Sequence, residues 1–103
     1  MDKIEKLKEF LQADPHDSFV RHALALEYIK AGDDEQARQL FESVIERDPG
    51  YTGAYYHLAK LLERIGETEA AIKIYENGME EAKKLGENHT YGELRSAYEE
   101  LIY

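Results

Sequence analysis

The chain has 103 residues, 43% of them hydrophobic, with neither an apolar run long enough to cross a bilayer nor an N-terminal signal peptide, so we expect a single soluble, cytoplasmic domain over residues 1–103. The 13 basic and 22 acidic residues give a formal net charge of −9, which disfavours nucleic acid and membrane surfaces as partners. The absence of cysteine excludes disulfide bonds, thiolate catalysis and cysteine-bound zinc.

The first predicted element is an amphipathic helix within residues 1–15. Its apolar stripe consists of Ile4, Leu7, Phe10 and Leu11. The helix is expected to end at Asp14-Pro15, because a residue that precedes proline is pushed away from helical angles. We interpret this segment as a half-repeat that corresponds to the second helix of a helical hairpin.

Residues 18–51 predict two helices joined by a tight turn. In the first helix, Leu24, Tyr28 and Ala31 recur at spacings of four and three, which indicates one buried stripe. Gly32 can end this helix in the left-handed conformation, and the acidic residues that follow suit the N-terminus of the next helix. The stripe of the second helix consists of Ala37, Leu40, Phe41, Val44 and Ile45.

Residues 52–87 repeat this plan at an offset of 34 residues. The aligned pairs are Asp14-Pro15 with Asp48-Pro49, Leu24-Ala25 with Leu58-Ala59, Gly32 with Gly66, Ala37 with Ala71, and Phe41 with Tyr75. Matches of turn-forming and apolar residues at a single offset rarely arise by chance, so the sequence predicts two complete repeats, residues 18–51 and 52–87. Thr52 and Thr68 are expected to cap the two helices of the second repeat.

Residues 88–103 predict one further helix. Thr90 and Glu93 have the spacing of a capping box, which would start the helix at that point. Its stripe consists of Tyr91, Leu94, Tyr98 and Leu101. Because its other positions carry charged residues, we expect it to cap the end of the array with a face toward water.

This pattern resembles the tetratricopeptide repeat. The resemblance rests on the 34-residue helix–turn–helix unit with Leu-Ala, Gly, Ala, an aromatic residue and Asp-Pro in order, and it is firm over residues 18–85. It implies an all-α protein of about six helices, a right-handed superhelical stack of antiparallel helix hairpins. Lys83 replaces the closing proline of the family pattern, the step to the last helix is two residues longer, and two further residues depart from the pattern. Arg21 occupies a slot that favours a large apolar residue, and Gly78 stands where a small helix former is expected, at a cost of about 1 kcal/mol relative to alanine.

The resemblance also implies a protein–protein interaction module that binds a peptide segment or partner subunit in a groove lined by the first helices of the repeats. In residues 18–31, the face opposite the core stripe is unusually apolar for a face in contact with water. The corresponding side of the second repeat offers Tyr56 and Lys60, followed by His89, Gly92 and Ser96 in the last helix. The candidate binding residues are Phe19, His22, Leu26, Ile29, Tyr56 and Lys60. The alternative is that the N-terminal helix covers Phe19 and Ile29.

Catalysis has no support in the sequence. The chain lacks a Gly-rich phosphate loop, a His-Glu-x-x-His helix and a Gly-x-Ser-x-Gly elbow, so we expect neither an enzyme nor a cofactor. No two of the four histidines have the three- or four-residue helical spacing of a metal site. Some relatives grip a C-terminal carboxylate with lysine, asparagine and arginine. The equivalent positions here hold His22, Leu26, His57, His89 and Glu93, so the resemblance implies that this clamp is absent.

The expected partner is therefore another protein or a peptide. An alternative is a self-assembling structural subunit, a homodimer formed through the C-terminal helix at Tyr91–Tyr103 or through an exchanged terminal helix.

Overall fold

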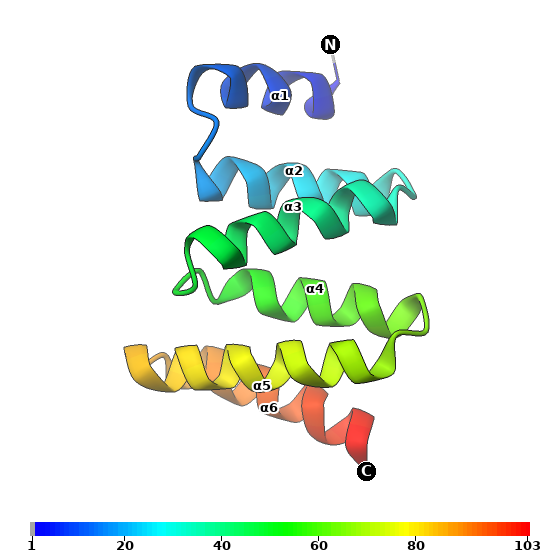
Figure 1. Ribbon diagram of the computed structural model, residues 1–103, viewed down its shortest axis with the longest axis vertical. Coiled ribbons are helices and arrows are strands. Elements are labelled where there is room, and N and C mark those ends of the chain that lie inside the picture. The colour runs from blue at the N-terminus through cyan, green and yellow to red at the C-terminus, as the bar shows by residue number, and fades with distance from the viewer. Residues whose placement is uncertain (1) are drawn as a thin grey trace. The chain divides into compact units, whose positions relative to one another are not determined.

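A computed structural model describes residues 2–103, which form six α-helices and contain no strand (Figure 1). The helices are α1 (Lys3–Ala13), α2 (Ser18–Lys30), α3 (Asp34–Arg47), α4 (Gly53–Arg64), α5 (Thr68–Leu85) and α6 (Asn88–Ile102). The expected all-α fold of six helices in successive hairpins is confirmed. Met1, which begins the predicted half-repeat, lies outside the described residues. The contacts divide the chain after Asp48 into two compact units, which are described in turn.

The first unit contains α1, α2 and α3, with α2 packed against both of its neighbours and antiparallel to them (Figure 1). Its buried apolar residues come from α2 and α3: Leu24, Ala25, Ala37, Phe41 and Val44. Helix α1 contributes no buried residue, and its side of the contact consists of half-buried Ile4, Leu7 and Leu11. Two residues of the predicted stripes do not share this burial, since the Phe10 side chain is half exposed and Ala31 lies in the exposed turn after α2.

Aspartates and glycines set the helix boundaries as the sequence indicates. The side chains of Asp17 and Asp33 accept hydrogen bonds from the backbone N–H groups of Val20 and Gln36, which caps α2 and α3. Gly32 ends the turn after α2 with a φ of 80°, in the left-handed region that glycine tolerates best, and Gly66 does the same after α4.

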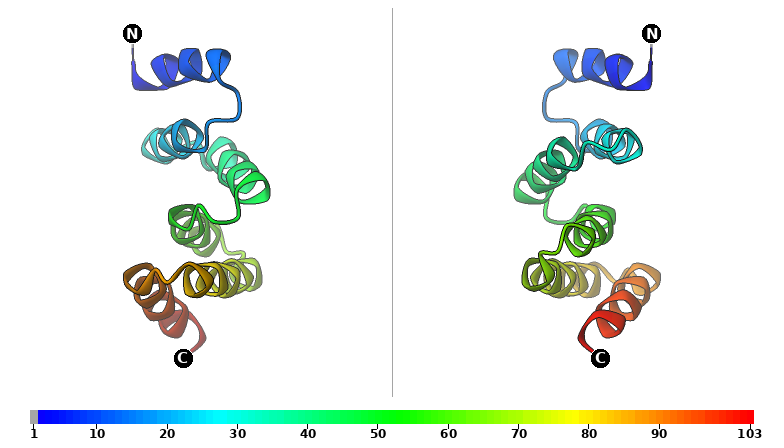
Figure 2. Two further views of the ribbon diagram at one scale, coloured as in Figure 1. Left: turned by 90° about the vertical axis from the view of Figure 1, so that its left-hand side faces the viewer. Right: turned by 90° about the vertical axis from the view of Figure 1, so that its right-hand side faces the viewer.

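The second unit contains α4, α5 and α6, with α5 packed against both α4 and α6 (Figures 1 and 2). Its core draws most heavily on α4, whose buried residues are Ala54, Tyr55, Leu58, Ala59, Leu61 and Leu62. The helices pack closely at Gly78 of α5, where an added Cβ would lie 2.7 Å from Cβ of Tyr55 and 3.1 Å from Cδ1 of Leu94. The close approach of α4 and α6 therefore requires a glycine at position 78. Gly78 has this role in packing in addition to its destabilising effect on its own helix.

Of the three predicted N-caps, Thr52 is correct in position and the other two are wrong. Thr52 stands at the start of α4, but its hydroxyl hydrogen bonds the carboxylate of Glu87 and makes no capping bond. Thr68 is the first residue of α5, so the N-cap is the preceding residue, Glu67. Helix α6 begins at Asn88, so Thr90 lies inside the helix and cannot cap it. The early start of α6 follows from the turn at Gly86, which ends α5 and leaves a single residue, Glu87, before the next helix.

Candidate functional site

Two adjoining pockets lie between α4 and α6 in the second unit. The larger has a volume of about 520 Å³ and is lined by Tyr56, Lys60, Asn88, His89, Gly92, Glu93, Ser96, Ala97 and Glu100. The smaller, of about 260 Å³, is lined by Gly53, Tyr56, His57, Thr90, Glu93 and Leu94. Because Tyr56 and Glu93 line both, the two pockets form one continuous surface, which we call the α4–α6 groove.

Helical periodicity and small residues create this groove. Gly53, Tyr56 and Lys60 recur at spacings of three and four, so they share one side of α4. The facing side of α6 carries Gly92 and Ser96 at a spacing of four. A Cβ built on Gly92 would meet no neighbouring side chain or helix within 4 Å, so the absence of a side chain there leaves space open to solvent.

Lys60 is the positive group of the groove. Its Nζ atom lies 5.8 Å from the centre of the Tyr56 ring, within range of a cation–π interaction. The same Nζ lies 3.8 Å from a carboxylate oxygen of Glu63, which also accepts a hydrogen bond from the buried Tyr75 hydroxyl. These contacts hold the ammonium group beside the aromatic ring at the edge of the groove.

Two histidines flank the carboxylate of Glu93. His89 Nε2 lies 3.6 Å from Glu93 Oε1 on the exposed side of α6. His57 is half-buried, and its ring packs edge-on against Tyr56 with the ring centres 5.7 Å apart. Burial lowers the pKa of His57, while the Glu93 carboxylate acts in the opposite direction. The groove thus combines the Lys60 ammonium group and two imidazoles with carboxylates, and burial favours the neutral form of the His57 ring.

The structure brings together the predicted site residues of the second repeat and last helix. Tyr56 and Lys60 line the groove together with His89, Gly92 and Ser96. Sequence reasoning missed Asn88, Ala97 and Glu100 as lining residues. Helical spacing could have found two of them, because Ala97 follows Glu93 by four residues and Glu100 follows Ser96 by four.

The other four candidates lie on α2 in the first unit. The side chain of Phe19 is 70% exposed, so α1 does not cover it. Leu26 and Ile29 are half-buried. His22 is also half-buried, and its ring packs edge-on against the buried Phe41 with the ring centres 5.5 Å apart. Part of the His22 side chain is thus used in packing α2 on α3.

Two general features bear on the class of site. Among residues 2–103, no group of three or more histidine, aspartate or glutamate side chains is placed to hold a metal ion. Within the same described part of the chain, none of the helices combines the length and the apolar composition that a membrane span requires.

Comparison with known proteins places the chain in a family. The profile of the tetratricopeptide repeat matches residues 28–88. The chain is 28% identical over 91 residues to TPR repeat-containing protein PA0015 of Pseudomonas aeruginosa, covering 88% of this chain and 87% of that protein. It is 43% identical to a tetratricopeptide repeat domain protein of Salinibacter ruber whose solution structure matches with a TM-score of 0.83, covering 86% of this chain and 90% of the other.

The fold itself extends to more distant proteins. The TPR2B domain of yeast Sti1, solved as a complex with pHsp70, matches with a TM-score of 0.87 at 17% identity, covering 95% of this chain and 78% of that one. The 34-residue period, the helical hairpins and the matched profile agree, and the chain belongs to the tetratricopeptide repeat family.

Proposed function

We propose that this protein binds a peptide segment of a partner protein in the α4–α6 groove. Tetratricopeptide repeat domains are generally protein–protein interaction modules. The observation that carries the proposal is the continuity of the two pockets, which offer an aromatic ring, charged groups of both signs and small residues along one surface.

The groove favours an internal peptide segment over a free C-terminus. A C-terminal carboxylate would approach Glu93 and Glu100, and like charges at close range repel each other. An internal segment instead offers backbone N–H groups to those carboxylates and carbonyl oxygens to Lys60. Tyr56 supplies apolar contact area with little loss of side-chain entropy.

The α2 surface supports a second contact region. Phe19 is a large apolar side chain in contact with water, and Leu26 and Ile29 remain partly accessible. We propose that these three residues also contact the partner.

A blocking variant tests the groove. Because a Cβ at position 92 would meet nothing within 4 Å and Gly92 lines the larger pocket, Gly92→Phe should fill that pocket and leave the fold intact. Lys73→Phe places the same ring on the exposed side of α5 and controls for added surface hydrophobicity. Proteins captured from lysate by the wild type and by Lys73→Phe, but not by Gly92→Phe, identify the ligands of the groove.

Peptides from those ligands are then measured by calorimetry. We expect Gly92→Phe to weaken their binding by at least about tenfold, which corresponds to roughly 1.4 kcal/mol. Equal binding by Gly92→Phe and the wild type, with both proteins folded, would contradict the proposal.

The homodimer alternative receives less support from α6. At the repeat position where α2 and α4 bury Ala25 and Ala59, α6 carries Arg95, whose Nε lies 3.1 Å from a carboxylate oxygen of Glu99. Both charged side chains are well exposed. Burying this pair against a second copy would remove both charges from water, at a cost that their mutual attraction offsets only in part.

A further inference from the structure

A third pocket, in the first unit, has chemistry unlike that of the groove. It has a volume of about 360 Å³ and is lined by His16, Arg21, Ser43, Glu46 and Arg47. Its lining includes two arginines and a histidine but only one carboxylate residue, in a protein whose formal net charge is −9. The residues that line this pocket therefore carry a net positive charge, whereas the chain as a whole is negative.

Arg21 occupies a position that the second repeat uses for packing. Its counterpart at the 34-residue offset is Tyr55, which is 2% exposed and donates a hydrogen bond of 2.8 Å from its hydroxyl to the carbonyl oxygen of Pro49. Arg21 is half-buried, and its Nη2 lies 3.5 Å from Nδ1 of His16 in the loop before α2. A position that can hold a buried tyrosine thus carries a charged residue that lines a pocket.

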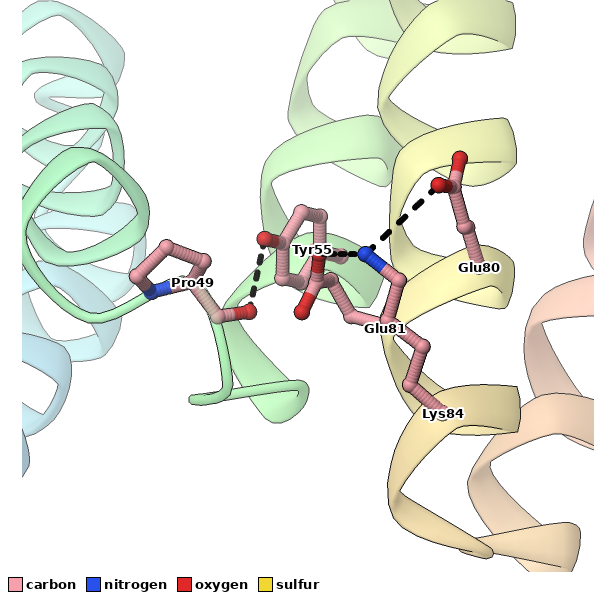
Figure 3. A network of polar contacts seen from close by, with 5 residues as sticks. All are labelled: Pro49, Tyr55, Glu80, Glu81 and Lys84. Carbon is pink, nitrogen blue, oxygen red and sulfur yellow. Dashed lines mark hydrogen bonds and ion pairs between the residues drawn. The ribbon is translucent and has the colours of Figure 1, made fainter.

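The equivalent corner of the second repeat shows that a positive pocket is not a general property of this fold. The residues that correspond to Glu46 and Arg47 are Glu80 and Glu81. Lys84 Nζ lies 3.6 Å from Glu80 Oε1 and 3.4 Å from Glu81 Oε2, as Figure 3 shows beside Tyr55 and Pro49. There, one cation is shared by two carboxylates.

We propose that the pocket of the first repeat binds a phosphate group, either as inorganic phosphate or as the phosphorylated side chain of a partner protein. The planar fork of arginine matches phosphate oxygens through paired, charge-assisted hydrogen bonds. A phosphate monoester carries about −1.5 to −2 charges near pH 7, so it gains more from Arg21 and Arg47 than a carboxylate would. Glu46 opposes the anion and limits its affinity.

Nuclear magnetic resonance titration of the full chain tests the proposal. The probes are inorganic phosphate, a phosphoserine peptide and the same peptide without phosphate. We expect both phosphate probes to shift amide signals around His16, Arg21 and Arg47, and the unphosphorylated peptide to leave them unchanged. Tighter binding of the phosphopeptide would identify a phosphorylated protein as the source, and equal binding would identify free phosphate. The absence of saturable shifts with either phosphate probe would overturn the proposal.

Substitutions separate binding from folding. Arg47→Gln should weaken phosphate binding by about tenfold, the usual scale for one charge-assisted contact, while Glu46→Gln should strengthen it. Arg38→Gln is the matched control, because Arg38 lies on the same helix and pairs with Glu42, outside the pocket. Arg21→Tyr restores the residue type of the second repeat, and we expect it to abolish phosphate binding with the fold retained. Equal effects of Arg47→Gln and Arg38→Gln on affinity would contradict the site.

Discussion

Gly78 and Gly92 both lie within helices, but replacing them by alanine should change the stability of the protein in opposite directions, because their surroundings differ. Alanine is favoured over glycine within a helix by about 1 kcal/mol. At Gly78 this gain is opposed by overlap of the new Cβ with Tyr55, 2.7 Å away, and overpacking of this kind costs about 1–3 kcal/mol. We therefore predict that Gly78→Ala destabilises the protein by about 1 kcal/mol, while Gly92→Ala stabilises it by up to about 1 kcal/mol.

Urea denaturation of the two alanine variants checks this prediction. The pair shares one substitution and differs only in what the added methyl group meets. Stabilisation by Gly78→Ala equal to that by Gly92→Ala would show that α4 and α6 can move away from α5 at little cost.

Because of Tyr75, the free energy of unfolding is expected to depend on pH in the alkaline range. Burial, and then the hydrogen bond to Glu63, raise the pKa of Tyr75 above its ordinary value of 10.0. Below pH 10 both the folded and the unfolded state keep the phenolic proton. Above it, the unfolded chain loses this proton while the folded chain retains it, so the free energy of unfolding falls as the pH rises.

The variant Tyr75→Phe removes this contribution. It should lower stability at neutral pH by about 1 kcal/mol through loss of the hydrogen bond, and it should make the decline above pH 10 shallower. Denaturation curves at neutral and alkaline pH measure both effects. Tyr103→Phe is the control for replacing a tyrosine by phenylalanine, because that side chain is 95% exposed.

At the scale of whole helices, α1 stabilises the first unit without entering its core. Half-buried Leu7 and Leu11 lie on its packed side, and Lys8 Nζ lies 5.8 Å from the centre of the Tyr28 ring of α2. Deleting residues 2–13 should expose apolar surface of α2 around Leu24 and destabilise the first unit. Hydrogen exchange should then show reduced protection in α2 and α3, with a smaller change in α4–α6. An unchanged melting temperature would contradict this role for α1.

The helix boundaries show what residue patterns can and cannot predict. Gly32 and Gly66 mark helix ends through a local conformational demand, so they could be located from the sequence alone. The start of α6 could not, because the turn geometry at Gly86 brings this helix forward to Asn88 and leaves Thr90 inside it. The Phe10 side chain, predicted on the apolar stripe of α1, is half exposed, because this helix packs mainly against α2 and buries none of its residues fully.

At the scale of the whole molecule, the repeat period predicted which residues of α4 and α6 would gather, since it places equivalent positions on equivalent faces. It could not predict the pocket around Arg21. That pocket joins a loop, the start of α2 and the end of α3, and its charge comes from residues that break the period. The pocket that distinguishes the first repeat from the second is therefore formed by residues that depart from the repeat pattern.

The charge distribution also leads to a prediction about assembly. The exposed apolar side chains at the end of α6 are Ile102 and Tyr103, while the preceding turn presents the Arg95–Glu99 pair to water. With a net charge of −9, two copies repel each other, and this small apolar tip buries too little area to overcome the repulsion. We predict a monomer at all accessible protein concentrations, measured by light scattering coupled to gel filtration. Arg95→Ala with Glu99→Ala should increase self-association. A wild-type dimer that Tyr103→Ser disrupts would instead establish α6 as an assembly surface.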